Sequence, residues 1–139
     1  MKKQPLRTWV EVDYTAITKN IRTLKGFVAP EISLMAVVKS NAYGHGMVAS
    51  ARAALSGGAS WLAVDEITEA LELRKEGIKS PILVLGYTLP DFYKTASDKK
   101  ISLTISSLES LQIISKLKLS KPLRIHIDRK STRLNSSHG

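Results

Sequence analysis

Cysteine is absent from the 139-residue sequence, and this absence excludes several kinds of chemistry. Without thiols the chain can form no disulfide, no thiolate metal site and no cysteine nucleophile. Its three histidines, His45, His126 and His138, lie far apart in sequence, so no local zinc motif is present and we expect no metal site. No apolar run approaches the roughly 18 residues that a membrane span needs, and no apolar signal core follows the basic N-terminus. We therefore expect a cytoplasmic protein with no membrane association.

Positive charge is in excess, which raises the question of a nucleic-acid partner. The formal net charge is +9. Residues 129–139 hold three basic residues and no acidic one, which leaves +6 on the first 128 residues. These charges are spread along the chain, with no arginine-rich helix and no interleaving of basic and aromatic residues. A mildly basic surface explains this pattern better than a nucleic-acid interface, whose binding would depend steeply on salt.

Short apolar runs alternate with amphipathic stretches, as in proteins that alternate strands and helices. Five apolar runs predict the strands of one sheet: Ile32–Val38, Trp61–Val64, Pro81–Leu85, Leu103–Ile105 and Pro122–Ile127. A further strand is predicted at Thr8–Val12. Helices are predicted from Asp13 to about Val28, over Met47–Leu55, Thr68–Glu76 and Leu108–Leu117, and in a short stretch after Pro90. This order implies right-handed crossovers and a parallel α/β sheet.

Two α/β architectures fit this order. The periodicity alone does not separate an open, doubly wound sheet from a (β/α)₈ barrel. No G-x-G-x-x-G follows any predicted strand, which weakens the dinucleotide-binding version of the open sheet. The sequence pattern by itself therefore leaves both architectures open.

Lys39 is the first candidate for chemistry, because it follows an apolar strand directly. In α/β barrels, active sites lie at the C-terminal ends of the strands. We expect a lysine there to be partly desolvated, which favours the neutral amine that attacks an aldehyde cofactor. Tyr43, in the turn that follows, can donate its hydroxyl to a phosphate, and Gly44 and Gly46 let the backbone approach closely. The spacing alone favours a simpler interpretation, a solvated strand-end lysine and a turn tyrosine, and His45 is expected to be a hydrogen-bonded bystander.

The segment around Lys39 resembles a known cofactor-attachment motif. Residues 36–46 read A-V-V-K-S-N-A-Y-G-H-G, which closely resembles the pyridoxal-phosphate attachment motif of alanine racemases. The opening T-W-V-E-V-D at residues 8–13 is similar to the start of that family. Residues 62–64 with 69–74 and 77–78, and residues 81–86, are similar to its following barrel units. The similarity runs from about Thr8 to Asp128.

This resemblance implies a fold and an activity. The fold would be a (β/α)₈ TIM-type barrel, of which this chain holds about five of eight strands, without the family's separate C-terminal β domain. The full-length enzyme would be a homodimer that interconverts L- and D-alanine and supplies D-alanine for cell-wall peptidoglycan. Lys39 would form the Schiff base with pyridoxal 5'-phosphate and move the proton on one face of the substrate carbon. Tyr43 would bind the cofactor phosphate, and Val37 and Leu85 would line the cofactor ring.

The resemblance weakens after Asp128. The family has a D-T-G-M-G-R type turn there, whereas this chain reads D-R-K-S-T-R and lacks both glycines. We expect residues 1–128 to be the N-terminal part of the barrel domain. Residues 129–139 are expected to be a non-native or disordered tail, and the chain a catalytically incomplete fragment. The alternative is a pyridoxal-phosphate carrier or homeostasis protein on the same barrel, without racemase activity.

Overall fold

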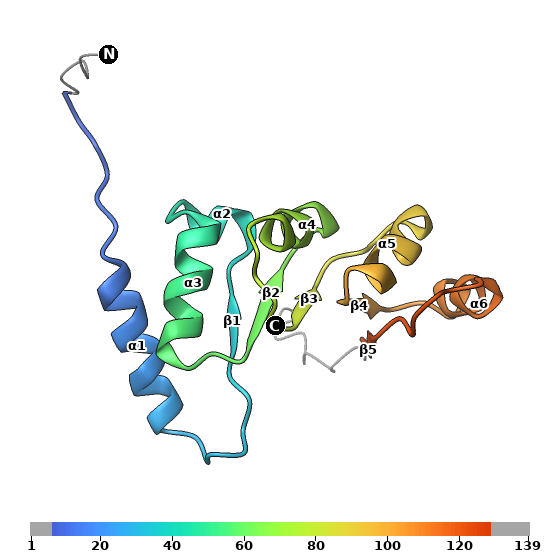
Figure 1. Cartoon of the computed structure of the whole chain (residues 1–139), viewed down its shortest axis with the longest axis horizontal. Coiled ribbons are helices and arrows are strands. Elements are labelled where there is room, and N and C mark those ends of the chain that lie inside the picture. The colour runs from blue at the N-terminus through green and yellow to red at the C-terminus, as the bar shows by residue number, and fades with distance from the viewer. Residues whose placement is uncertain (1–6, 129–139) are drawn as a thin grey trace, which may run out of the picture.

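The structure is a computed structural model that describes residues 7–128, in which strands and helices alternate (Figure 1). The strands are β1 (Met35–Val37), β2 (Trp61–Val64), β3 (Ile82–Val84), β4 (Ile101–Ile105) and β5 (Ile125–Ile127). The helices are α1 (Tyr14–Gly26), α2 (Lys39–Tyr43), α3 (Met47–Gly57), α4 (Ile67–Lys75), the 3₁₀ turn η1 (Pro90–Phe92), α5 (Tyr93–Asp98) and α6 (Leu108–Lys116). All five strands predicted for the sheet are confirmed, although β1 is shorter than the apolar run that predicted it. In the range 7–128 no helix is long and apolar enough to cross a membrane.

The sheet has the strand order of a barrel. All neighbouring pairs are parallel, and the order β1-β2-β3-β4-β5 follows the chain without a reversal. A doubly wound sheet would reverse its strand order at the point where the helices change face. The parallel α/β sheet is therefore confirmed, and its order favours the barrel.

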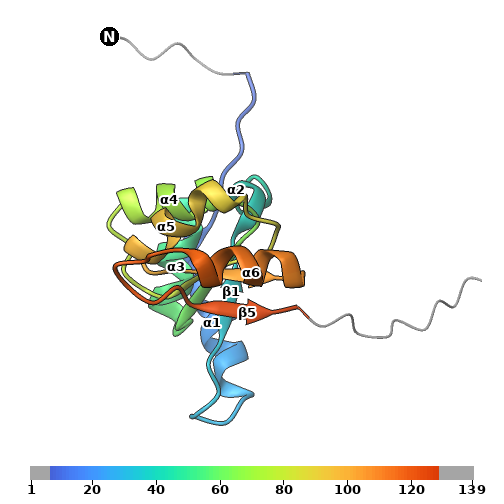
Figure 2. The same cartoon turned by 90° about the vertical axis from the view of Figure 1, so that its right-hand side faces the viewer.

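The sheet is also curled. The rings of Trp61 on β2 and His126 on β5 have centroids 5.7 Å apart, although β3 and β4 lie between these strands. In a flat sheet, three strand spacings would separate them by about 14 Å. The curl brings the two side chains together over the concave face, as the closing wall of a barrel requires. Figure 2, turned by 90° from Figure 1, shows β5 with α6 alongside it.

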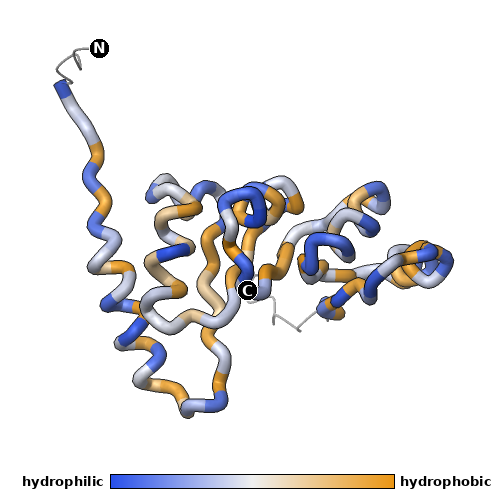
Figure 3. The backbone as a smooth tube through the Cα atoms, in the orientation of Figure 1, coloured by the Kyte–Doolittle hydropathy of each residue, from blue (hydrophilic) through white to orange (hydrophobic). Residues whose placement is uncertain are grey.

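The hydrophobic core lies between the outer face of the sheet and the helices. Alternate strand residues supply one side of it, including Leu62, Val64, Ile82, Val84 and Leu103, all of them fully buried. Ala70 and Leu73 of α4 pack against them. In Figure 3 the apolar colour follows the strands, while apolar and polar segments alternate along the helices. Because neighbouring strand residues point to opposite faces, the intervening positions face the concave side.

Helix α1 begins and packs as its sequence predicts. The Asp13 carboxylate accepts hydrogen bonds from the backbone N–H groups of Thr15 and Ala16, at 2.8 and 3.1 Å, and so caps the helix at its predicted start. The helix packs against α3 at Gly57, where the two backbones approach closely. A Cβ atom added at Gly57 would lie 2.6 Å from the Thr18 carbonyl oxygen and 2.7 Å from the Ile21 Cβ.

Replacing Gly57 with alanine should therefore push α1 away from α3. We expect the free energy of unfolding to fall by about 1–3 kcal/mol, the usual cost of overpacking. Urea denaturation followed by circular dichroism measures this loss. Gly26→Ala is the matched control, because a Cβ there meets no atom within 4 Å. Equal destabilisation by both substitutions would contradict the packing argument.

The strand predicted at Thr8–Val12 is wrong for the described chain. This segment has no regular secondary structure, and the side chains of Trp9 and Val10 are 67% and 87% exposed. A strand needs a neighbouring backbone to complete its hydrogen bonds, and within residues 7–128 none pairs with it. The Trp9 indole N–H instead donates to Glu11 Oε1 at 2.7 Å.

Candidate active site

The strand register places three side chains in one row at the C-terminal edge of the sheet. Val37 pairs with Ala63, and Ala63 pairs with Leu83. Two residues beyond these paired positions come Lys39, Asp65 and Leu85. Because side chains alternate between faces with a period of two, these three project from neighbouring chain segments on the same, concave side. The structure therefore brings two of the predicted site residues, Lys39 and Leu85, to the same edge.

Lys39 forms an ion pair with the next residue in this row. Its Nζ donates a hydrogen bond to Asp65 Oδ1 at 3.2 Å, and the two side chains are 33% and 47% exposed. This hydrogen bond and the charge of Asp65 raise the pKa of the Lys39 amine above its ordinary value. The expectation that desolvation would favour the neutral amine is wrong for this structure. The strand ends at an open edge, where water and a carboxylate both reach the amine.

Glu69 of α4 forms hydrogen bonds to both chain segments that carry Lys39 and Asp65. Its Oε1 accepts the backbone N–H of Ser40 at 2.6 Å, and its Oε2 accepts the backbone N–H of Asp65 at 2.9 Å. Oε2 also accepts the N–H of Glu66 at 3.3 Å, at the start of α4. The Glu69 carboxylate therefore binds both Ser40, which follows Lys39, and Asp65, the ion-pair partner of Lys39. Charge-assisted hydrogen bonds of this kind are stronger than neutral ones.

The chain after Lys39 makes a left-handed turn. Four consecutive residues that are not glycine, Ser40 to Tyr43, have φ between 51° and 53°. Each costs about 1–2 kcal/mol for an ordinary L-residue, so neighbouring groups must hold the turn. The Asn41 side chain accepts the Met47 N–H at 2.9 Å, and the Tyr14 hydroxyl donates to the His45 carbonyl oxygen at 2.8 Å. The polar, glycine-bearing turn is confirmed, but its handedness was not predicted.

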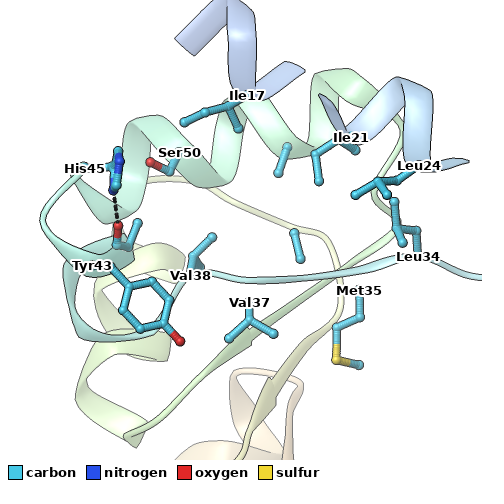
Figure 4. Close-up of a pocket in the computed structure, with 13 residues that line it drawn as sticks. Ile17, Ile21, Leu24, Leu34, Met35, Val37, Val38, Tyr43, His45 and Ser50 are labelled. Atoms are coloured by element: carbon cyan, nitrogen blue, oxygen red, sulfur yellow. Dashed lines mark hydrogen bonds between the residues drawn. The ribbon is translucent and has the colours of Figure 1, made fainter. Parts of the chain in front are cut away.

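His45 has a structural place in this turn. Its Nδ1 lies 2.8 Å from the carbonyl oxygen of Ala42, so this ring nitrogen carries the hydrogen and donates it (Figure 4). The interpretation of His45 as a hydrogen-bonded bystander therefore agrees with the geometry. The φ values of Gly44 and Gly46, 90° and 86°, explain the glycines at these positions, since side chains rarely adopt this backbone conformation.

Tyr43 and Val37 both lie exposed beside the strand edge. The Tyr43 side chain is 66% exposed, and Val37 is 47% exposed. Figure 4 shows Val37 and Met35 on the side of β1 opposite to Val38, which points toward the helices. Tyr43 lies on the same side as Val37, and its negative form is close enough to favour the Lys39 ammonium. A large apolar surface that is exposed at such an edge is available to a planar ligand.

An apolar hollow beside β1 does not coincide with this row. A pocket of about 350 Å³ follows the free edge of β1 between α1 and α3, lined by Ile17, Ile21 and Leu24 on one side and reaching Val37 and Tyr43 on the other (Figure 4). Neither Lys39 nor Asp65 lines it. Its lining is nearly all apolar, with Ser50 and His45 as exceptions. The hollow therefore belongs to the outer edge of β1, beside which no further strand lies within residues 7–128.

Asp65 and Glu69 were missed by the sequence reasoning. Asp65 follows a buried strand directly, as Lys39 does, and this shared position is the signal that could have revealed it. Glu69 could have been found as an acidic residue in the first turn of a helix that follows such a strand. Across residues 7–128, no three His, Asp or Glu side chains gather as a metal site requires.

Comparison with known sequences gives a consistent family. The sequence profile of the family described as "Alanine racemase, N-terminal domain" matches residues 12–133. Alanine racemase 1 of Bacillus subtilis is 44% identical over 120 residues, which cover 86% of this chain and 31% of that protein. The chain thus spans about a third of the length of the curated relatives it matches. The profile match runs past Asp128, and the tail predicted at residues 129–139 lies outside the described residues.

Solved structures show the same fold. Alanine racemase from Bacillus anthracis with bound L-Ala-P superposes with a TM-score of 0.83 and 40% sequence identity, over 91% of this chain and 33% of that one. A histidine racemase from Leuconostoc mesenteroides superposes with a TM-score of 0.74 and 30% identity, over 81% of this chain and 30% of that one. The matched portions are about a third of each solved chain, so the described sheet corresponds to part of a larger barrel.

Proposed function

Since this chain belongs to the family of alanine racemase N-terminal domains, we propose that it is the cofactor-bearing part of an enzyme that interconverts L- and D-alanine. The observation that carries the proposal is the position of Lys39. Its amine is accessible at the C-terminal edge of a partial α/β barrel, where such folds place their chemistry. Production of D-alanine for cell-wall peptidoglycan is the biological role that we propose with it.

The described residues fit pyridoxal 5'-phosphate, the cofactor that we propose. An aldehyde needs an accessible amine, and the Lys39 side chain is one third exposed. A phosphate needs hydrogen-bond donors, and the exposed Tyr43 hydroxyl can donate. A pyridine ring needs apolar surface, and Val37 and Leu85 both leave apolar side chains exposed near this edge. These residues are proposed to hold the cofactor in the roles that the sequence resemblance implies.

The bound cofactor would supply the electron sink that makes the α-proton of an amino acid acidic. Lys39 would bond to the cofactor aldehyde and, once displaced by substrate, would move the proton on one face of the α-carbon at Nζ. Asp65 would accept a hydrogen bond from the Lys39 amine whenever that amine is not bonded to the cofactor. Racemisation also needs a proton donor on the opposite face, and we propose that it comes from another part of the full-length homodimer.

The substrate assignment rests on the relatives. Most of the compared proteins are named alanine racemases, and one is named a histidine racemase. Both kinds share the barrel described above, so the fold alone supports an amino-acid racemase and the number of alanine racemases favours alanine. A racemase assay with both amino acids would decide between these substrates.

The cofactor assignment is tested by chemical mapping. The 139-residue chain is incubated with pyridoxal 5'-phosphate, reduced with borohydride, digested and analysed by peptide mass spectrometry. We expect the reduced adduct on Lys39 at a higher yield than on any other lysine. Adducts spread evenly over the surface lysines, with no preference for Lys39, would overturn the proposed role.

Replacing Tyr43 with phenylalanine should weaken cofactor binding while leaving the fold unchanged. We expect a loss of about 0.5–3 kcal/mol, the contribution of one hydrogen bond, with the upper part for a charged phosphate. Fluorescence titration with pyridoxal 5'-phosphate measures the dissociation constant. Tyr87→Phe is the control, since Tyr87 is equally exposed but follows β3. Unchanged affinity in the Tyr43 variant would remove the hydroxyl from the proposed phosphate site.

A further inference from the structure

We propose that Asp65 is a positioning residue for Lys39: its carboxylate holds the ammonium group at the sheet edge and sets the pH at which the amine becomes reactive toward an aldehyde. The inference rests on the proposed function in one respect, namely that Lys39 is the residue that bonds to the cofactor. It adds a role for a residue that neither the sequence motif nor the resemblance singled out.

The register of the two strands places Lys39 and Asp65 at neighbouring positions. Lys39 and Asp65 each lie two residues past the paired positions Val37 and Ala63, on adjacent parallel strands. The Val38 N–H donates to the Ala63 carbonyl oxygen at 2.8 Å, so the ladder continues up to the pair itself. Adjacent strands are about 4.8 Å apart, and a lysine and an aspartate at equivalent positions can then reach each other. The Nζ–Oδ1 distance of 3.2 Å shows that they do.

Glu69 stabilises the arrangement in which Lys39 and Asp65 form their ion pair. An ion pair between two exposed side chains normally loses much of its value to side-chain entropy. Here the Glu69 carboxylate accepts the backbone N–H groups of Ser40 and Asp65, at 2.6 and 2.9 Å, and so holds both loops to one helix. The backbone N–H of Gly86 donates to the Asp65 carbonyl oxygen at 3.0 Å and restrains the same loop. The backbone on both sides of the Lys39–Asp65 ion pair is therefore restrained by hydrogen bonds.

The charges around Lys39 all act in one direction. Asp65 has the largest effect, through its hydrogen bond and its charge, and the phenolate form of Tyr43 and the charge of Glu69 act in the same direction. Only desolvation opposes them, and the pKa of Lys39 is raised. Below this raised pKa the amine keeps its proton and has no free lone pair. Removal of the Asp65 charge should lower the pKa, so that the neutral amine is present at a lower pH.

The test measures the reactivity of Lys39 with a small aldehyde, independently of any cofactor site. The probe is formaldehyde with cyanoborohydride: the neutral amine adds to the aldehyde, water leaves, and the reductant supplies hydride to give the methylated lysine. The 139-residue chain and its variants are labelled briefly between pH 6 and 10. The Lys39 peptide is then quantified by mass spectrometry, and circular dichroism checks each fold.

We expect Asp65→Asn to label at Lys39 about two- to fivefold faster than the unsubstituted chain below the pKa, as for loss of a partly exposed ion pair. Asp65→Glu should retain most of the slow labelling, because it keeps the charge. Glu72→Gln is the matched control: it removes an equal charge from the exposed face of α4 and should leave the Lys39 rate unchanged. Identical rates for Lys39 in Asp65→Asn and the unsubstituted chain would overturn the proposal.

A measurement on the unsubstituted chain keeps the test independent of any variant's folding. Lys75, exposed on α4, makes no ion pair within residues 7–128 and serves as the reference in the same sample. We expect Lys39 to label more slowly than Lys75 at neutral pH, and an equal or faster rate at Lys39 would contradict the proposal. Failure of the proposed function shows differently: pyridoxal phosphate would show no preference for Lys39, whatever the methylation rates are.

Discussion

Replacing Lys39 with alanine should abolish racemase activity in a full-length enzyme that carries this N-terminal segment. Such an enzyme can be made by joining residues 1–128 to the remainder of alanine racemase 1 of Bacillus subtilis, which is 44% identical over the matched region. A general base alone contributes about 10²–10⁴-fold to the rate. The substitution also removes the proposed covalent attachment point, so we expect the loss to exceed about 10⁴-fold.

The measurement follows D-alanine with a stereospecific oxidase at saturating cofactor. Lys75→Ala is the control, because it removes an exposed lysine on α4 that lies outside the proposed site. It should leave kcat within about twofold, as expected for a surface substitution away from structural features. Retention of more than a tenth of the activity by the Lys39 variant would mean that another group does the chemistry attributed to Lys39.

The 139-residue chain alone should show no racemase activity, which is the second large effect that we expect. The described residues bring one amine, Lys39, to the proposed cofactor edge, whereas racemisation needs proton transfer on both faces of the α-carbon. The sheet also leaves both of its outer strands without a neighbour among residues 7–128. Edge strands with exposed apolar residues, such as Ile127 on β5, favour non-native association.

This expectation is checked with the purified chain, pyridoxal 5'-phosphate and L-alanine, followed by enzymatic detection of D-alanine. Free cofactor and the Lys39→Ala chain give the background rates. The chimeric full-length enzyme shows that the assay detects turnover when the remaining parts are present. Formation of D-alanine above both backgrounds by the unsubstituted chain would show that the segment is catalytically sufficient.

The sequence predicted those elements of the fold that depend on a local pattern of residues. Apolar runs predicted the five strands of the sheet, and Asp13 predicted the start of α1, because burial and capping depend on neighbouring residues. Thr8–Val12 shows the limit of this reasoning: an alternating pattern describes a strand, but hydrogen-bond partners from elsewhere decide whether one forms. Periodicity alone also left the barrel unresolved, because the strand order and the contact between Trp61 and His126 are tertiary features.

The candidate site was predictable in outline but not in its electrostatics. The position of Lys39 after a strand predicted its place at the sheet edge. Its ionisation state depended on Asp65, 26 residues further along the chain, and on the register that aligns the two strands. The role of Glu69 depended on the left-handed turn after Lys39, which turns the Ser40 N–H toward α4. None of these relations is local in sequence, which is why the expectation of a desolvated lysine was wrong.

The left-handed turn also limits what mutagenesis can reveal at residues 40–43. At these positions the backbone conformation itself restricts which amino acids fit, with glycine, asparagine and aspartate favoured and β-branched residues disfavoured. Sequence variation there would therefore be narrow even if a side chain touched neither substrate nor cofactor. Loss of activity after Ser40→Val, for instance, would report a distorted main chain and would not identify Ser40 as a participant in the reaction. Interpreting natural variants in this segment thus requires a conformational control, such as the glycine substitution at the same position.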